Sequence, residues 1–195
     1  MGSETENEPP FEILPGLPPY GPAAEPFPED GRQAYREGLV IRFRPRGNPS
    51  WVGNFQRGWS VFNSVVLHPD QYQVIVVAGG AGYIVDPGSR RQMHQFGLSG
   101  SISFLQSLPE LNLVVVGDGL RIAACLADDT GWCTERISWD GMRNITVTAS
   151  TLRGEAWSPV SDRWHPFEVD LLTGKTSEAI YPREMANAIR IAPSA

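Results

Sequence analysis

The sequence contains few of the residues that enzymes and metal proteins commonly use as nucleophiles, bases and metal ligands. It has one lysine, two cysteines and three histidines among 195 residues. The thiols of Cys125 and Cys133 flank an expected turn at residues 127–131, and a hairpin symmetric about Asp129 would place them face to face. In a cytoplasmic protein we expect both to be free. The histidines His68, His94 and His165 are scattered without the spacing of metal ligands.

Long apolar runs and basic clusters are also missing. No run approaches the roughly 18 apolar residues that cross a bilayer, and the N-terminal stretch lacks the charged and apolar regions of a secretory signal. We therefore expect a cytoplasmic protein without a membrane partner. Residues 1–31 hold seven acidic residues and no Lys or Arg, and the remainder is close to neutral. Nothing is basic enough to predict a nucleic-acid partner.

Glycine and proline, in contrast, are abundant, with 20 and 17 residues, while charged residues make up only 19%. Both residue types favour turns, so many short strands are expected rather than long helices. From Leu39 onward apolar and polar residues alternate, as in half-buried strands. The sequence predicts an all-β fold of about ten short antiparallel strands. The expected strands are Leu39–Arg44, Trp51–Phe55, Val61–Leu67, Gln73–Ala78, Tyr83–Asp86, Ser101–Leu105, Leu111–Val116, Leu120–Leu126, Trp132–Ser138, Arg143–Ala149 and Phe167–Leu171.

The ends of the chain differ from its middle. Residues 1–36 are interpreted as a disordered, acidic, Pro-rich tail, because eight of the 17 prolines lie between Pro9 and Pro28. The apolar residues Phe11, Ile13 and Leu14 leave open that part of the tail docks as an extended strap. Residues 37–182 are predicted to form a single β domain. Residues 183–195 are expected to be a short helix, near 183–189, or a tail.

The β region also contains an internal similarity. Residues 76–85 match residues 113–122 at an offset of 37, and each copy carries a Gly-rich turn, Gly79–Gly82 in one and Gly117–Gly119 in the other. A looser third unit covers residues 141–182. With units near 61–98, 99–140 and 141–182, the sequence predicts blade-like meanders of a partial propeller, with a β-sandwich as the alternative.

Several segments carry a family resemblance. Residues 64–70 with 79–87, and residues 156–159 with 167–175, resemble degenerate blades of WD-type propellers. The pattern of Leu17–Gly21, Trp51–Phe55 and Ser138–Gly141 resembles β-rich bacterial proteins with such degenerate repeats. The resemblance implies blade-like sheets. It implies no activity, and Trp139-Asp140 is the chain's sole Trp-Asp pair.

Catalytic patterns are weak. The Gly79–Gly82 loop precedes a strand rather than a helix, so a hairpin turn explains it better than a phosphate site. No serine lies in a nucleophile elbow, and Asp128 and Asp129 fit turn chemistry as well as a weak cation site. Carboxylates are numerous, but no pair stands out. We therefore assign no catalytic, cofactor or metal residue. The carboxylates considered are Glu135, Asp140, Glu155, Asp162, Glu168 and Asp170.

Two groups of side chains are candidates for binding. Trp157, Asp162 and Trp164 are close enough in sequence to form a ledge on which a sugar ring stacks, although core packing accounts for most of the six tryptophans. Arg42, Arg44 and Arg46 alternate along one strand, with Arg57 nearby. They form a candidate face for an anion, an acidic partner or the protein's own acidic tail, with a solvated strand face as the simpler reading.

These features lead to a functional expectation. We expect a non-enzymatic β scaffold that binds a protein partner or assembles with itself. A homodimer through residues 141–182 is one form of this expectation, because Phe167–Leu171 resembles an unguarded sheet end. A carbohydrate-binding module with tryptophan platforms is the alternative. A hydrolase with a carboxylate pair that the sequence does not locate is the second alternative.

Overall fold

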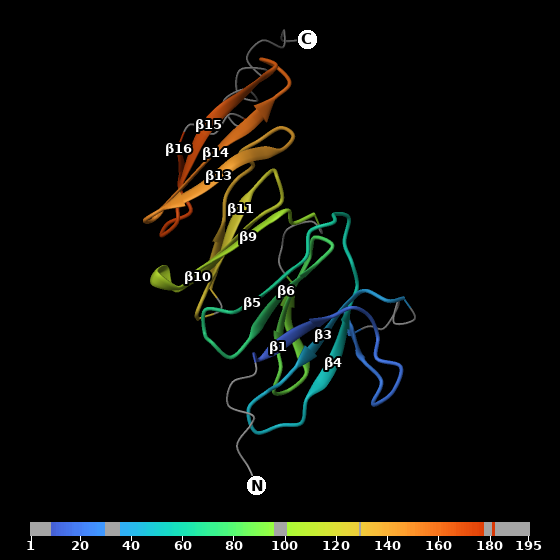
Figure 1. The fold of residues 1–195 in the computed structure, drawn as a ribbon. Coiled ribbons are helices and arrows are strands. Elements are labelled where there is room, and N and C mark those ends of the chain that lie inside the picture. The colour runs from blue at the N-terminus through green and yellow to red at the C-terminus, as the bar shows by residue number, and fades with distance from the viewer. Residues whose placement is uncertain (1–8, 30–35, 96–100, 129, 178–180, 182–195) are drawn as a thin grey trace, which may run out of the picture. The chain divides into compact units, whose positions relative to one another are not determined.

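The computed structural model describes residues 9–29, 36–95, 101–128, 130–177 and 181. Within these residues it contains sixteen strands and one short 3-10 helix, Pro109–Leu111. The strands form four four-stranded sheets, antiparallel except where β2 pairs with β4 (Figure 1). The all-β fold class is therefore confirmed, and the sheets fit a blade-like or a sandwich arrangement. The helix expected near residues 183–189 lies outside the described residues.

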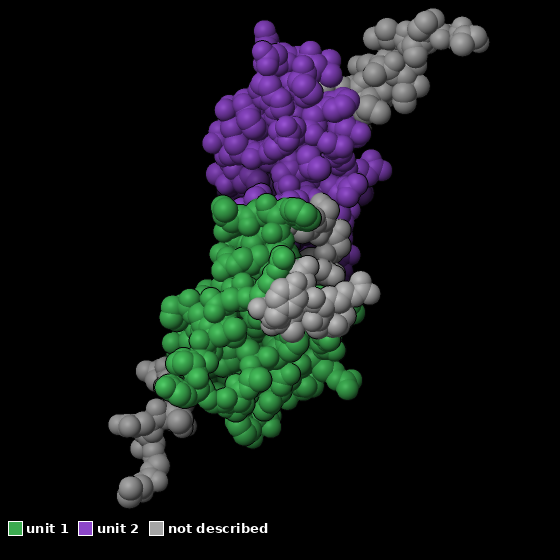
Figure 2. Space-filling model, turned by 90° about the vertical axis from the view of Figure 1, so that its right-hand side faces the viewer, with its two compact units in different colours: residues 1–100 green, residues 101–195 purple. Residues whose placement is uncertain are grey.

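The chain divides into two compact units, residues 1–100 and 101–195 (Figure 2). Each unit contains two sheets. The first unit has the sheet β1-β3-β4-β2, built from Phe11–Leu14, Leu39–Phe43, Trp51–Phe55 and Glu25–Phe27, and the meander β5 to β8, built from Ser64–Leu67, Val74–Ala78, Ala81–Asp86 and Arg91–Gln95.

The second unit consists of two consecutive meanders. The strands β9 to β12 are Phe104–Leu108, Leu113–Gly117, Ile122–Leu126 and Gly131–Cys133, and the strands β13 to β16 are Met142–Thr148, Thr151–Ser158, Arg163–Asp170 and Thr176–Ser177.

Each unit has its own hydrophobic core, because alternate residues of its two sheets face one another. In the first unit Phe43 and Phe55 from one sheet meet Tyr83 from the other. In the second unit Val115 and Phe167 belong to one buried cluster. The sequence predicted a single β domain over residues 37–182; the described residues of this range belong to two compact units with two separate buried clusters. Alternation shows that a strand has a buried face but not which other strand covers it.

The expectation that residues 1–36 form a disordered tail is wrong for two segments. Strand β1 pairs with β3, and β2 pairs with β4, so both edges of the β3–β4 hairpin are covered by the N-terminal segment. The physical reason is apolar burial, since Phe27 is 2% exposed and Phe11 packs against the same core. Burying these rings offsets the entropy of ordering a Pro-rich chain. The docked-strap alternative is therefore correct for residues 11–14.

Strand β14 is missing from the sequence prediction, although it is the centre of its sheet. Two of its four outward positions, Arg153 and Glu155, are charged, and Gly154 interrupts the apolar pattern on the inward side. The structure explains this glycine, because a Cβ there would lie 2.8 Å from the ring of Phe167 on β15. A strand that needs a glycine opposite an aromatic ring does not show the usual period-two signal.

The two Gly-rich turns have equivalent places in the topology. Gly79 and Gly80 join β6 to β7, and residues 118–121 join β10 to β11, so each turn connects the second and third strands of a meander. The first loop has two residues and the second has four. A fixed offset of 37 therefore cannot superpose both strands of each hairpin.

The proposed open end at residues 167–171 is also different in the structure. Strand β15 pairs with β14 over its whole length and with β16 at Glu168 and Val169. The side chain of Val169 is fully buried. The argument for self-association through residues 141–182 rested on an unguarded sheet end at this strand, and the strand instead has a paired strand on each side.

Candidate functional site

The structure brings two of the three predicted ledge residues together. Trp157 on β14 lies directly opposite Trp164 on β15, with ring centroids 5.3 Å apart and planes tilted by 56°. The guanidinium carbon of Arg143 lies 4.3 Å from the centroid of the Trp164 ring. Both rings are half-buried. The two rings therefore do not form a flat open platform, and a cation already occupies one ring face.

The surroundings of this pair are polar. Glu155 accepts hydrogen bonds from Arg143 Nε at 2.8 Å and Asn144 Nδ2 at 2.6 Å, and these bonds hold the pKa of the Glu155 carboxyl below its ordinary value. Asp162 is exposed in the turn that joins the two strands, with a φ of 51°. The third ledge residue thus lies beside the pair in the chain as a turn residue.

One polar pair in this hairpin was not anticipated. Ser161 Oγ and His165 Nε2 are 2.7 Å apart, a serine-histidine hydrogen bond of the kind that activates a nucleophile. Activation also needs a group that orients the imidazole. No carboxylate bonds to His165 among the residues that the structure describes. This pair alone therefore does not constitute a catalytic arrangement.

The predicted arginine face is divided between three places. Arg42 and Arg44 both bind the carboxylate of Glu12 on β1, and the Arg42 contact measures 3.3 Å. Hydrogen bonding to Arg44 lowers the pKa of Glu12. Arg46 lies exposed in the β3–β4 turn, and Arg57 lies in the loop before β5. Of the ligands considered from the sequence, the protein's own acidic tail is the one found on this face.

A different feature, the loop of residues 56–63, places two large apolar side chains in solvent. Trp59 is 91% exposed and Val61 is 95% exposed. Single exposed apolar residues are common, but neighbouring ones that expose apolar surface together mark interaction sites, and these two lie two positions apart on one loop. We call residues 56–63 the Trp59 loop. The sequence predicted a strand from Val61, but β5 begins only at Ser64.

Backbone hydrogen bonds fix the Trp59 loop to the β6–β7 hairpin. Gly58 N donates to Ala78 O at 2.9 Å, and Ser60 N donates to Gly79 O at 2.8 Å. In the reverse direction Gly80 N donates to the loop carbonyl of Phe62 at 3.0 Å. The loop is thus attached along its length to a hairpin whose strand β6 is entirely buried.

Side chains complete this attachment. Asn63 Oδ1 accepts a hydrogen bond from Gly79 N at 2.8 Å and another from Arg57 Nη1 at 3.3 Å. Arg57 also donates to the carbonyl of Gly38 at 3.3 Å. Gly79 has a φ of +53°, and a Cβ there would lie 2.8 Å from Arg57 Cβ. The close approach of loop and hairpin therefore requires glycine at position 79.

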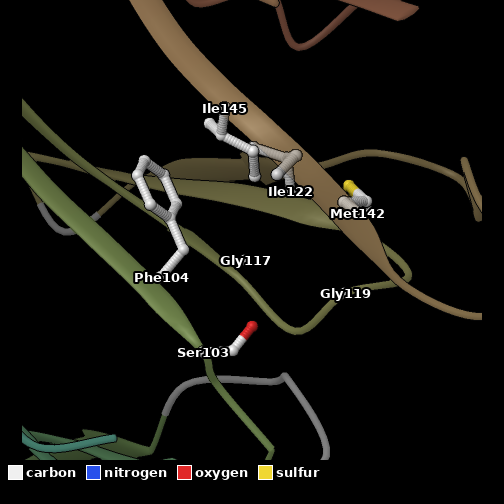
Figure 3. A pocket seen from close by; sticks show the side chains of 7 residues that line it. All are labelled: Ser103, Phe104, Gly117, Gly119, Ile122, Met142 and Ile145. Carbon is white, nitrogen blue, oxygen red and sulfur yellow. The ribbon is translucent and has the colours of Figure 1, made fainter. Parts of the chain in front are cut away.

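A cavity of about 280 Å³ lies in the second unit, between strands β9, β11 and β13. Figure 3 shows Phe104, Ile122, Met142 and Ile145 around it, with the hydroxyl of Ser103 nearby. The residues described around it carry no charged or nucleophilic group other than this hydroxyl. The cavity supplies no catalytic group.

Two of the carboxylates considered from the sequence are bonded to neighbouring side chains. Glu168 is bonded to Arg153, and Asp170 accepts hydrogen bonds from Thr173 that lower its pKa. A general acid needs the opposite shift. Among the described residues no cluster of His, Cys, Asp or Glu has the composition of a metal site, and no helix is long and apolar enough to cross a membrane.

The two thiols do not face each other as the symmetric hairpin predicted. Cys125 lies opposite Gly131, and Cys133 lies opposite Ala123, because the hairpin register is shifted from symmetry about position 129. Neither cysteine is in a disulfide among the described residues, and Cys125 is buried whereas Cys133 is exposed.

No protein-family model and no curated protein sequence matches this chain. Among solved structures, it is similar to two crystal structures of the extracellular domain of BT4673 from B. thetaiotaomicron, described as a one-component system and as a hybrid two-component system. Both share 12% sequence identity, with TM-scores of 0.46 and 0.45, and the matches cover 72% and 74% of this chain. This chain spans 22% of the length of each of those chains.

A crystal structure of the eukaryotic initiation factor is also similar, at 12% identity and a TM-score of 0.40. That match covers 72% of this chain and 39% of the other. At these levels of similarity none of the matches carries a functional argument.

Proposed function

We propose that this protein is a non-enzymatic β scaffold that binds another protein through the Trp59 loop. The observation that carries the proposal is the 91% exposure of Trp59 on a loop held by backbone hydrogen bonds to a buried hairpin. An apolar side chain on a mobile loop is easily tolerated. An apolar side chain on an ordered loop stays exposed to water in the free protein. A partner that covers the side chain therefore gains the free energy of burying its apolar surface.

The energetics support a contact at this position. A tryptophan buries about 150–250 Å² at an interface, which at about 25 cal/mol per Å² corresponds to about 4–6 kcal/mol before the costs of association. Because the loop is already ordered, binding has less conformational entropy to offset. Trp and Arg are also the residues that dominate measured interface energies.

The neighbouring charge indicates the partner's chemistry. The guanidinium of Arg57 bonds only to neutral oxygens, those of Asn63 and Gly38, among the residues described by the structure. Its positive charge therefore has no carboxylate partner among the described residues, and it lies two positions before Trp59 in the chain. We propose a partner surface with an apolar pocket for the indole and a carboxylate at its rim.

The carbohydrate alternative is less well supported by the geometry. Stacking of a sugar needs an open aromatic face, whereas Arg143 covers one face of Trp164 and the two rings are tilted. The hydrolase alternative would require a carboxylate with a raised pKa, and Glu155 and Asp170 have lowered pKa values.

Site-specific photo-crosslinking in the source cell tests the proposal. A benzophenone amino acid replaces Trp59 in one full-length protein and Tyr72 in the control, since Tyr72 is 83% exposed in the turn at the other end of β6. We expect a discrete crosslinked species from position 59 and none from position 72. Adding Val61→Asp to the first protein should remove this species. Equal crosslinking from both positions, or none from position 59, contradicts the proposal.

A further inference from the structure

Strand β1 shows how the first sheet recognises an extended peptide. Residues Phe11–Leu14 add to the edge of β3 in antiparallel register, and Arg44 N donates to Pro10 O at 2.8 Å just beyond the pairing. Phe11 supplies an apolar contact with the core, and Glu12 supplies the carboxylate that Arg42 and Arg44 bind. Main-chain pairing gives affinity, and the alternate side chains give specificity, as in peptide recognition by strand addition.

The attachment of this strand is slight. It pairs with β3 over four residues, it lies at the edge of the sheet, and Ile13 remains 51% exposed. Short edge elements with half-exposed contacts open at a small fraction of the global unfolding free energy. Release of β1 therefore costs less free energy than unfolding of the sheet.

The segment that follows is long enough to reach a neighbouring molecule once the hydrogen bond from Leu17 N to Glu37 Oε2, 3.0 Å long, is released. Residues 15–24 contain four prolines, at positions 15, 18, 19 and 22, and an extended Pro-rich chain rises about 3.1 Å per residue. Ten such residues span about 30 Å. The segment ends at β2, where Phe27 is buried and stacks on Phe55 with centroids 4.6 Å apart. The released strand thus remains tied to a fixed anchor.

From these contacts we propose that β1 is an exchangeable strand: residues 11–14 of one copy dock on β3 of a second copy, and Glu12 of each binds Arg42 and Arg44 of the other. The exchange regains every contact of β1 in trans and forms an isologous dimer. It uses a surface different from the Trp59 loop and does not depend on the function proposed for that loop.

Charge reversal across the pair provides the test. One full-length protein carries Glu12→Arg, and a second carries Arg42→Glu with Arg44→Glu. Each alone has like charges between β1 and β3. When the two proteins are mixed, β1 of each can dock on β3 of the other. Position 12 and positions 42 and 44 then have opposite charges at both exchanged interfaces. We expect sedimentation velocity at micromolar concentration to show at least tenfold more dimer in the mixture than in either protein alone.

A single chain with all three substitutions restores the pair within one molecule and should behave as the wild type. Increasing salt should reduce the dimer in the mixture, because the discriminating contacts are partly exposed charges. A mixture that remains two monomers overturns the proposal. So does a dimer that forms equally well from either protein alone.

A peptide measurement covers the case in which a variant folds poorly. A fluorescent peptide of residues 8–16 is added to the full-length variant Phe11→Asp, whose own strand lacks its apolar contact. Saturable binding is expected, with at least a tenfold loss for the peptide carrying Glu12→Arg. Absence of binding, or equal binding of both peptides, overturns the proposal independently of the dimer assay.

Discussion

Trp157 stands opposite Trp164 across strands β14 and β15, in a register that continues to the pair of Thr151 and Asp170. Their ring centroids are 5.3 Å apart, and Arg143 covers the second ring at 4.3 Å. These two tryptophans therefore contribute mainly to the stability of their hairpin. Trp59, in contrast, is 91% exposed. The two kinds of tryptophan should respond differently to truncation.

We predict that Trp164→Ala lowers the free energy of unfolding by about 1.5–3 kcal/mol, since it removes an aromatic pair, a cation–π contact and half-buried apolar surface. The matched change Trp59→Ala should alter it by less than about 0.5 kcal/mol, as for other exposed substitutions. Urea unfolding followed by circular dichroism measures both. Equal losses would mean that Trp59 packs in the folded protein and is not available for a partner.

A second prediction concerns the glycine that positions the Trp59 loop. Gly79→Ala should lower the free energy of unfolding by about 1–3 kcal/mol, because the residue has a positive φ and its Cβ would meet Arg57 at 2.8 Å. Gly47→Ala is the control. Gly47 also has a positive φ, of +75°, but nothing lies within 4 Å of its Cβ position.

Chemical denaturation of both glycine variants separates strain from crowding. The Gly47 variant reports the cost of the backbone conformation alone, and the excess at Gly79 reports the contact with the loop. If the two variants lose the same stability, then the loop does not approach the hairpin as closely as the structure shows.

Acid should weaken the first unit through Asp70. Burial tends to raise the pKa of this carboxyl, but hydrogen bonds from the backbone of Gln73 and Tyr72 and from His68 outweigh it, so the pKa is lowered from 3.8. The folded state then binds a proton less readily than the unfolded state. The stabilising contribution is complete above the unfolded value and is lost as the pH falls through the lower folded value.

The variant Asp70→Asn isolates this contribution. Its amide oxygen can still accept hydrogen bonds from the backbone but does not titrate in this range. We expect the wild type to lose more stability than the variant when the pH is lowered from about 5 to about 2, measured by thermal unfolding at each pH. Parallel curves for the two proteins would exclude Asp70 as a source of the acid sensitivity.

The sequence is informative where a strand has a clear apolar pattern and the turn to the next strand is short. Val74–Ala78 and Ala81–Asp86 are apolar runs around a Gly-Gly pair, and the hairpin they form was expected from these residues alone. The proximity of Trp157 and Trp164 was also expected from their spacing in the chain, although the strand that carries Trp157 was not. Local pattern is sufficient in these cases because the partner strand is adjacent in the chain.

The rest depends on contacts between distant segments. Nothing near Trp59 shows that residues 78–80, about twenty positions later, hold its loop in solvent. The docking of β1 depends likewise on Arg42 and Arg44, thirty positions away. The arginines were recognised as a face for an acidic tail, but one sequence cannot show which carboxylate binds them. The periodicity of apolar residues does not show which distant segments of the chain pair with one another.

The last prediction concerns the two thiols. Residues placed diagonally across neighbouring strands have Cα atoms about 7–8 Å apart, beyond the 4.4–6.8 Å that a disulfide usually spans. Because Cys125 and Cys133 are offset in this way, we expect two titratable thiols without prior reduction.

Burial raises the pKa of the Cys133 thiol, which reduces its reactive thiolate fraction. Cys133 should therefore react with Ellman's reagent more slowly than free cysteine at about pH 8, and Cys125, which is 6% exposed, should react only on unfolding. The variant Cys133→Ser should lose the native reaction while it keeps the one in denaturant. Equal rates for both thiols in the native protein, or no thiol before reduction, would contradict the register of β11 and β12.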